Sequence, residues 1–185
     1  TLSFDAASGI LMSPPVPAVG ETYSMLLLAL RSQQEPIQDF TLTIRATTQE
    51  QLRTPTPQPW EGFWLFFNYK LGIDGFKETN YFLLKPTGIE LGRAFNERGQ
   101  AYLQTLPNPV LVMGTANTFT IVKSGQHLEV FIDGTSVMTF DGNSSDTAGC
   151  DGAGCWLYDV AGEIGLYTED ATVHVDSVTV ELPAT

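Results

Sequence analysis

Aromatic side chains of the kind that bind sugars cluster in the middle of the chain together with hydrogen-bonding residues, and the aromatic ones are Trp60, Trp64, Tyr69, Tyr81 and Tyr102. Pyranose rings have apolar C–H faces that pack on aromatic rings, and their hydroxyl groups need polar partners, so a sugar site combines both residue types. The candidate ligand-binding residues are Trp64, Asn68, Tyr81, Lys85, Glu90 and Arg93. The alternative interpretation is that these aromatic rings fill the core of a folded domain.

The segment Phe63–Lys70 is typical of an aromatic β-strand. Successive side chains of a strand point to opposite faces of its sheet. If Phe63, Leu65 and Phe67 face the core, then Trp64 and the other alternate residues face the opposite side. We expect the remaining candidates to join this second face from adjacent strands, namely Tyr81, Lys85, Glu90 and Arg93.

Asp176 lies where the alternation of the last candidate strand changes phase. Val173 and Val175 follow one phase, whereas Val178 and Val180 follow the other. Because the side-chain period of a strand is two, this one-residue change predicts a bulge near Asp176. A carboxylate at a bulge is a candidate ligand for Ca²⁺, which takes about six to eight oxygen ligands. The alternative is a solvated aspartate at a bend.

Two cysteines enclose a short glycine-rich loop. Cys150 and Cys155 are separated by four residues, of which two are glycine. A local disulfide is therefore sterically possible, and it would indicate an oxidising compartment. Two free thiols and a two-cysteine metal site are the alternatives.

Charge and hydropathy exclude two classes of partner. The net charge of −12, from 21 acidic and 9 basic residues, argues against binding to nucleic acid, which needs clustered Lys and Arg. The longest apolar run, Met25–Leu30, is far shorter than the roughly 20 residues of a membrane span, so we expect no membrane insertion. A length of 185 residues fits one domain, residues 1–185.

Candidate strands recur along the chain between clusters of Gly, Pro, Asn and Asp, and no long window has the apolar period of a helix. The segment Phe40–Thr47, for example, alternates apolar and polar residues. The region Phe95–Gly114 is less regular and is compatible with a short helical turn or an extended loop. About eleven short strands predict an all-β, two-sheet antiparallel sandwich, in which Leu2–Asp5 pairs with the final strand.

Several of these segments occur in an order that is characteristic of a known superfamily. The segments are Asn68–Lys70, Asn80–Lys85, Gly88–Gly92, His127–Gly134, Gly162–Tyr167 and Val175–Val180. Their order resembles the concanavalin A-like lectin/glucanase superfamily, with the nearest likeness to laminin-G-like modules and 3-keto-disaccharide hydrolase domains. These are structural signatures, so they indicate a fold and not an activity.

The resemblance implies a jelly roll in which one sheet is concave and often binds a ligand. Several members hold a structural calcium between the first and last strands, with an aspartate of the last strand as a ligand. By position, Asp176 matches this aspartate, and Asp5 is a possible N-terminal partner for the same ion.

An enzyme activity has no motif to support it. Retaining glycosidases of the superfamily carry paired carboxylates on one strand, as Glu-x-Asp-x-Glu or Glu-x-Asp-x-x-Glu, and neither pattern occurs in this chain. A lyase needs a base and cations that neutralise a uronate, and Tyr81, Lys85 and Arg93 could supply them. Catalytic residues therefore stay unknown.

Together these observations predict a lectin-like jelly-roll module that binds an oligo- or polysaccharide and holds a structural calcium. We expect it to be secreted or at the cell surface, and to form part of a larger cell-surface protein. A glycan-active hydrolase or lyase is the first alternative, and a structural or adhesion module is the second.

Overall fold

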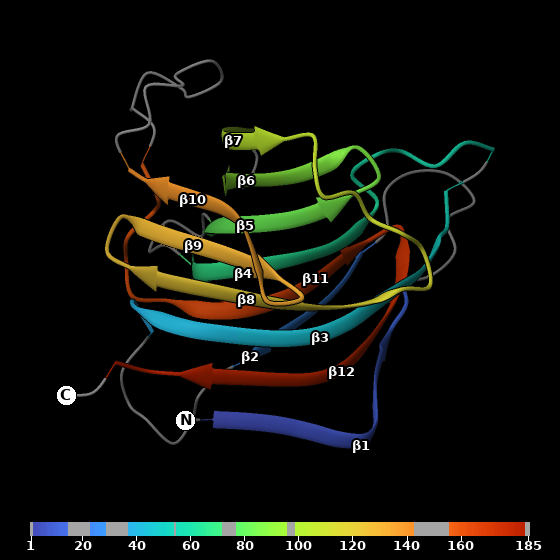
Figure 1. The fold of residues 1–185 in the computed structure, drawn as a ribbon, viewed down its shortest axis with the longest axis horizontal. Coiled ribbons are helices and arrows are strands. Elements are labelled where there is room, and N and C mark those ends of the chain that lie inside the picture. The colour runs from blue at the N-terminus through green and yellow to red at the C-terminus, as the bar shows by residue number, and fades with distance from the viewer. Residues whose placement is uncertain are drawn as a thin grey trace.

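The computed structural model of the chain describes residues 2–14, 23–28, 37–53, 55–71, 77–95, 99–142 and 156–183. Within these ranges the chain forms twelve β-strands and no helix, in two antiparallel sheets of six strands that face each other (Figure 1). No helix among the described residues is therefore long and apolar enough to cross a membrane. The prediction of an all-β, two-sheet antiparallel sandwich is confirmed.

The first sheet holds the closing strands of the chain. Its order is β1 (Leu2–Met12), β12 (Ala171–Glu181), β3 (Phe40–Gln51), β8 (Ala116–Ser124), β9 (His127–Ile132) and β10 (Thr135–Asp141). The predicted pairing of the N-terminal segment with the final strand is confirmed, since Phe4 lies opposite Val178 at the sheet edge that Figure 1 shows.

The second sheet carries the aromatic segment. Its order is β2 (Tyr23–Leu28), β11 (Glu163–Glu169), β4 (Gly62–Leu71), β5 (Lys77–Lys85), β6 (Gly88–Phe95) and β7 (Gly99–Leu106). Strand β7 lies within the region for which an irregular loop or helical turn was expected, so that expectation is wrong for these residues.

The hydrophobic core lies between the two sheets, and strand alternation selects its members. Strand β3 buries every second residue from Phe40 to Ala46, and β4 contributes Phe63, Leu65 and Phe67. Burial of one such side chain contributes about 1.5–3 kcal/mol to the free energy of unfolding. The predicted core face of the aromatic strand is therefore confirmed, and Trp64 and Phe66 lie on its opposite face.

The predicted bulge in the last strand is also present. In the pairing of β12 with β3, Val175 lies opposite Ala46 and Ser177 lies opposite Arg45, which leaves Asp176 as the extra residue. The bulge reverses the alternation, so that the apolar residues on both sides of it face the same core.

Candidate functional site

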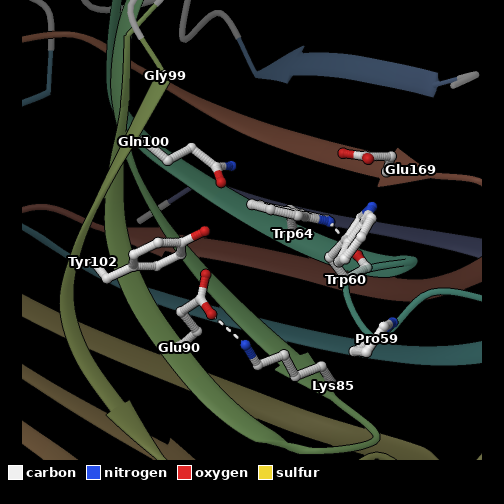
Figure 2. A pocket seen from close by; sticks show the side chains of 9 residues that line it. All are labelled: Pro59, Trp60, Trp64, Lys85, Glu90, Gly99, Gln100, Tyr102 and Glu169. Atoms are coloured by element: carbon white, nitrogen blue, oxygen red, sulfur yellow. Dashed lines mark hydrogen bonds and ion pairs between the residues drawn. The ribbon is translucent and has the colours of Figure 1, made fainter. Parts of the chain in front are cut away.

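A groove lies on the face of the second sheet that points away from the core. It consists of two neighbouring hollows of about 470 Å³ and 320 Å³, which share Trp64, Gln100 and Glu169 in their lining. We call the larger one the first hollow and the smaller one the second hollow. The first hollow is further lined by Pro59, Trp60, Lys85, Glu90, Gly99 and Tyr102 (Figure 2). The second is further lined by Tyr23, Met25, Phe66, Tyr69, Thr79, Ala94 and Tyr167.

The register of the sheet explains why these residues meet. Tyr167 lies opposite Trp64, Trp64 lies opposite Leu83, and Leu83 lies opposite Glu90. This row crosses four strands, and the parallel row beside it runs from Phe66 through Tyr81 and Gly92 to Tyr102. Residues in such rows share one face of the sheet.

Two of the predicted ligand-binding aromatics lie at the floor of the groove, where Trp64 lines both hollows and Tyr81 is buried beneath them. Trp64 is 3% exposed and Tyr81 is 0% exposed, and their ring centroids are 4.8 Å apart. The indole Nε1 of Trp64 donates a hydrogen bond to the backbone oxygen of Trp60 at 3.0 Å. Both rings therefore support the site from below and offer a ligand little surface of their own.

Tyr81, Glu90 and Lys85 form a connected polar group at this floor. The Tyr81 hydroxyl donates to Oε1 of Glu90 at 2.8 Å, and the Lys85 ammonium donates to Oε2. Burial and the neighbouring Glu90 carboxylate raise the pKa of Tyr81 well above its usual range, so the phenol stays a neutral donor. The carboxylate is thus held in one orientation from both sides.

The accessible aromatic surface comes from two residues of the predicted aromatic cluster that are not among the six candidate ligand-binding residues. Trp60 is 39% exposed and Tyr102 is 46% exposed, and both line the first hollow. The sequence could have indicated that Tyr102 faces the groove. Its neighbours Ala101 and Leu103 are apolar and buried on the core side, so alternation places Tyr102 on the opposite face. Trp60 lies in the turn before β4, where no alternation indicates its direction.

Asn68 lies outside the groove. Strand β4 is irregular between Phe67 and Lys70 in its pairing with β5, and Asn68 has a φ of +53°. Its buried amide donates to the backbone oxygens of Gln38 at 3.1 Å and Val160 at 2.7 Å. The side chain thus ties together two loop segments, which the alternation of the strand did not predict.

Arg93 also lies outside the groove. It is three residues from Glu90 on a regular stretch of β6, and an odd spacing places the two side chains on opposite faces. The Arg93 guanidinium lies over the ring of Tyr158, 5.9 Å from its centroid. Of the six predicted ligand-binding residues, the structure therefore brings together Trp64, Tyr81, Lys85 and Glu90.

The predicted calcium ligands lie at the far edge of the other sheet. Oδ2 of Asp176 is 3.2 Å from Nε of Arg45, and Oδ1 is 2.9 Å from Nδ1 of His174. The backbone of Asp5 lies opposite Ser177, beside the bulge. In the described part of the chain, no group of three or more His, Cys, Asp or Glu side chains is arranged so that it could hold a metal ion. Calcium binding stays a prediction, and Cys150 and Cys155 fall outside the described residues.

Comparisons with known proteins concern the fold. No family model and no curated protein matches the sequence. The structure is similar to the carbohydrate-binding module CBM66 from Bacillus subtilis, with a TM-score of 0.57 and 14% identity over 94% of this chain and 91% of that chain. It is similar to the galectin LEC-6 from Caenorhabditis elegans, with a TM-score of 0.52 and 12% identity over 85% and 95% of the two chains.

A third similar structure is that of an enzyme. The β-glucanase of Bacillus licheniformis gives a TM-score of 0.53 and 11% identity, over 94% of this chain and 78% of that chain. Identities this low establish a shared architecture and leave the activity to be argued from the site itself. The two-sheet topology and these likenesses together show that the chain has the concanavalin A-like lectin/glucanase jelly-roll fold.

Proposed function

We propose that the chain binds a neutral oligo- or polysaccharide in the groove. The observation that carries this proposal is the pair of exposed rings, Trp60 and Tyr102, on either side of the polar floor formed by Glu90 and Lys85 (Figure 2). Aromatic walls suit the apolar faces of sugar rings, and the fixed polar groups suit their hydroxyls. The shared fold with a carbohydrate-binding module supports the same conclusion.

The charge of the first hollow favours an uncharged ligand. Its charged lining residues are one cation, Lys85, and two anions, Glu90 and Glu169, so their formal sum is −1. The whole chain carries a net charge of −12. A polyuronate or a sulfated glycan would approach against this field, whereas a neutral glycan would not.

The shape of the groove favours a chain of sugars over a single one. Tyr102 on β7 and Tyr23 on β2 lie on the two outermost strands of the sheet, and each lines one of the joined hollows. Six strands spaced by about 4.8 Å span roughly 24 Å, which is several sugar rings. The second hollow adds the stacked rings of Tyr167 and Phe66, whose centroids are 4.9 Å apart.

A panel of glycans tests this proposal. Cellohexaose, xylohexaose, galactan linked through O4, laminarihexaose and levan represent neutral chains, and polygalacturonate represents an anionic one. Isothermal titration calorimetry should detect binding to at least one neutral glycan and none to polygalacturonate. Silence across the neutral panel would reject the proposal, and binding to a partner protein would then favour an adhesion module.

Glycan hydrolysis is the second candidate, because two carboxylates, Glu90 and Glu169, line the same hollow. Two carboxylates beside one sugar are the usual requirement of a glycosidase. Release of reducing ends from the same panel would establish turnover, and its loss in both Glu90→Gln and Glu169→Gln would assign it to this pair.

The proposal retains a structural calcium at Asp176 and a secreted or cell-surface location. Support for the calcium is the bulge, which exposes one carboxylate at the junction of the first and last strands. A cation there would compete with Arg45 and His174 for the carboxylate oxygens.

A further inference from the structure

The Glu90 carboxylate has acceptor capacity left after its contacts within the protein. A carboxylate offers about four lone-pair positions, two on each oxygen. The Tyr81 hydroxyl uses one position on Oε1, and the Lys85 ammonium uses one on Oε2. One position on each oxygen is therefore left, and Figure 2 shows the carboxylate pointing into the first hollow.

We infer that Glu90 recognises a vicinal diol, two hydroxyl groups on neighbouring carbons of one sugar ring, each of which donates to one carboxylate oxygen. The inference rests on the proposed function and names the feature of the glycan that the groove selects. Hydrogen bonds to an ionised acceptor are about twice as strong as neutral ones, and a two-point contact adds geometric specificity. Lys85, with three N–H donors, can donate to the oxygen of the same hydroxyls.

The protein holds the carboxylate ready for such a contact. The Tyr81 ring packs against Trp64 and also lies directly against the backbone of Gly92. A side chain at position 92 would collide with the ring. Tyr81 and Gly92 are positioning residues in this arrangement, because they fix Glu90 without lining the groove themselves. Preorganisation of this kind lowers the entropy cost of binding.

The inference predicts a preference among linkages. In pyranose chains linked through O4, each interior unit keeps neighbouring hydroxyls at C2 and C3. In chains linked through O3, the interior hydroxyls at C2 and C4 are separated by the linkage, so no neighbouring pair is left. Cellohexaose and laminarihexaose are both uncharged glucose hexamers, and they differ in this respect.

Calorimetry with these two hexamers, xylohexaose and the galactan linked through O4 tests the inference. We expect at least one of the O4-linked glycans to bind about tenfold more tightly than laminarihexaose. Glu90→Gln should weaken that binding about tenfold and remove most of the preference, whereas Glu181→Gln, at an exposed carboxylate on the other sheet, should keep both the affinity and the preference. Tyr81→Phe should lower the preference ratio with little change in affinity for laminarihexaose, which a purely structural role would not produce.

The possible failures are distinguishable. Equal or tighter binding of laminarihexaose would overturn the inference and leave the proposed function standing. Levan also keeps neighbouring ring hydroxyls, at C3 and C4 of each interior unit, so if levan alone binds, the inference requires Glu90→Gln to weaken that binding about tenfold and is overturned if it does not. A preference that survives in Glu90→Gln would also overturn it. If no neutral glycan binds, the proposed function fails and the inference falls with it.

Discussion

The ring of Tyr81 occupies the space in which a side chain at Gly92 would lie. A Cβ atom at position 92 would come within 2.4 Å of both Cζ and the hydroxyl oxygen of Tyr81. The phenol can therefore cross strand β6 and reach Glu90 on the same strand. A missing side chain on one strand thus sets the orientation of a carboxylate two residues away.

Gly92→Ala should destabilise the protein and weaken glycan binding. The added methyl group forces the Tyr81 ring to move, and overpacking of this kind costs about 1–3 kcal/mol of the free energy of unfolding. Gly62→Ala is the matched control, because a Cβ there meets nothing nearer than 3.5 Å. Urea unfolding and calorimetry of both variants make the comparison, and equal stabilities would contradict the prediction.

Trp60→Ala and Tyr102→Ala should each weaken binding of a panel glycan by about 1–2 kcal/mol, because each removes one exposed wall of the groove. The fold should be retained, since the bond from Trp64 uses the backbone oxygen of residue 60. Trp156→Ala is the control: Trp156 is 40% exposed and lines a separate hollow beside His127. Equal losses of glycan affinity in all three variants would argue against the groove as the binding site.

Trp64→Ala should act on stability more than on ligand contact. Its buried indole packs on Tyr81 and Tyr167, and removal of a buried tryptophan costs about 3–5 kcal/mol. Thermal unfolding followed by near-ultraviolet circular dichroism measures the loss. A wild-type melting temperature combined with lost binding would instead identify Trp64 as a ligand contact.

The fold was predictable because alternation and its interruptions are encoded locally. The phase change between Val175 and Val178 predicts the bulge at Asp176 from the pleat of a strand alone. Strand β7 was missed because only Ala101 and Leu103 in it are fully buried, as suits an edge strand with one polar face.

The site was predictable only in part. The groove-facing directions of Trp64 and Glu90 follow from strand alternation. Their degree of exposure does not, because it depends on the turn whose backbone at Trp60 is hydrogen-bonded to the Trp64 indole. The direction of Asn68 could not be predicted from strand alternation, because its positive φ interrupts the regular alternation of side chains in β4. Strand alternation alone could have excluded Arg93 from the groove, because it lies three residues from Glu90 and an odd spacing places the two side chains on opposite faces.

The calcium proposal predicts a rise in melting temperature when CaCl₂ is added to metal-free protein, because an ion that binds only the folded state stabilises it. Asp176→Ala should abolish the rise. Asp141→Ala, at another exposed carboxylate near a strand end, should leave the rise unchanged and serves as the control. A melting temperature independent of calcium would reject the site.

Stability should fall at alkaline pH because of Tyr81. Burial and the Glu90 carboxylate raise the pKa of this phenol in the folded protein, whereas in the unfolded chain it loses its proton near about pH 10. Below that pH both states keep the proton and no stability is lost. Above it, deprotonation stabilises only the unfolded chain, by up to about 1.4 kcal/mol per pH unit.

Urea unfolding between about pH 9 and pH 11 measures this effect. Tyr81→Phe should be less stable at neutral pH, because it loses the hydrogen bond to Glu90, and should decline less steeply above pH 10. Tyr102→Phe removes an exposed phenol that makes only the smallest contribution to the raised pKa of Tyr81, so its decline should stay closer to that of the wild type than the decline of Tyr81→Phe does. Parallel curves for the wild type and Tyr81→Phe would show that the phenol ionises equally in both states, and that the floor of the groove is open to water.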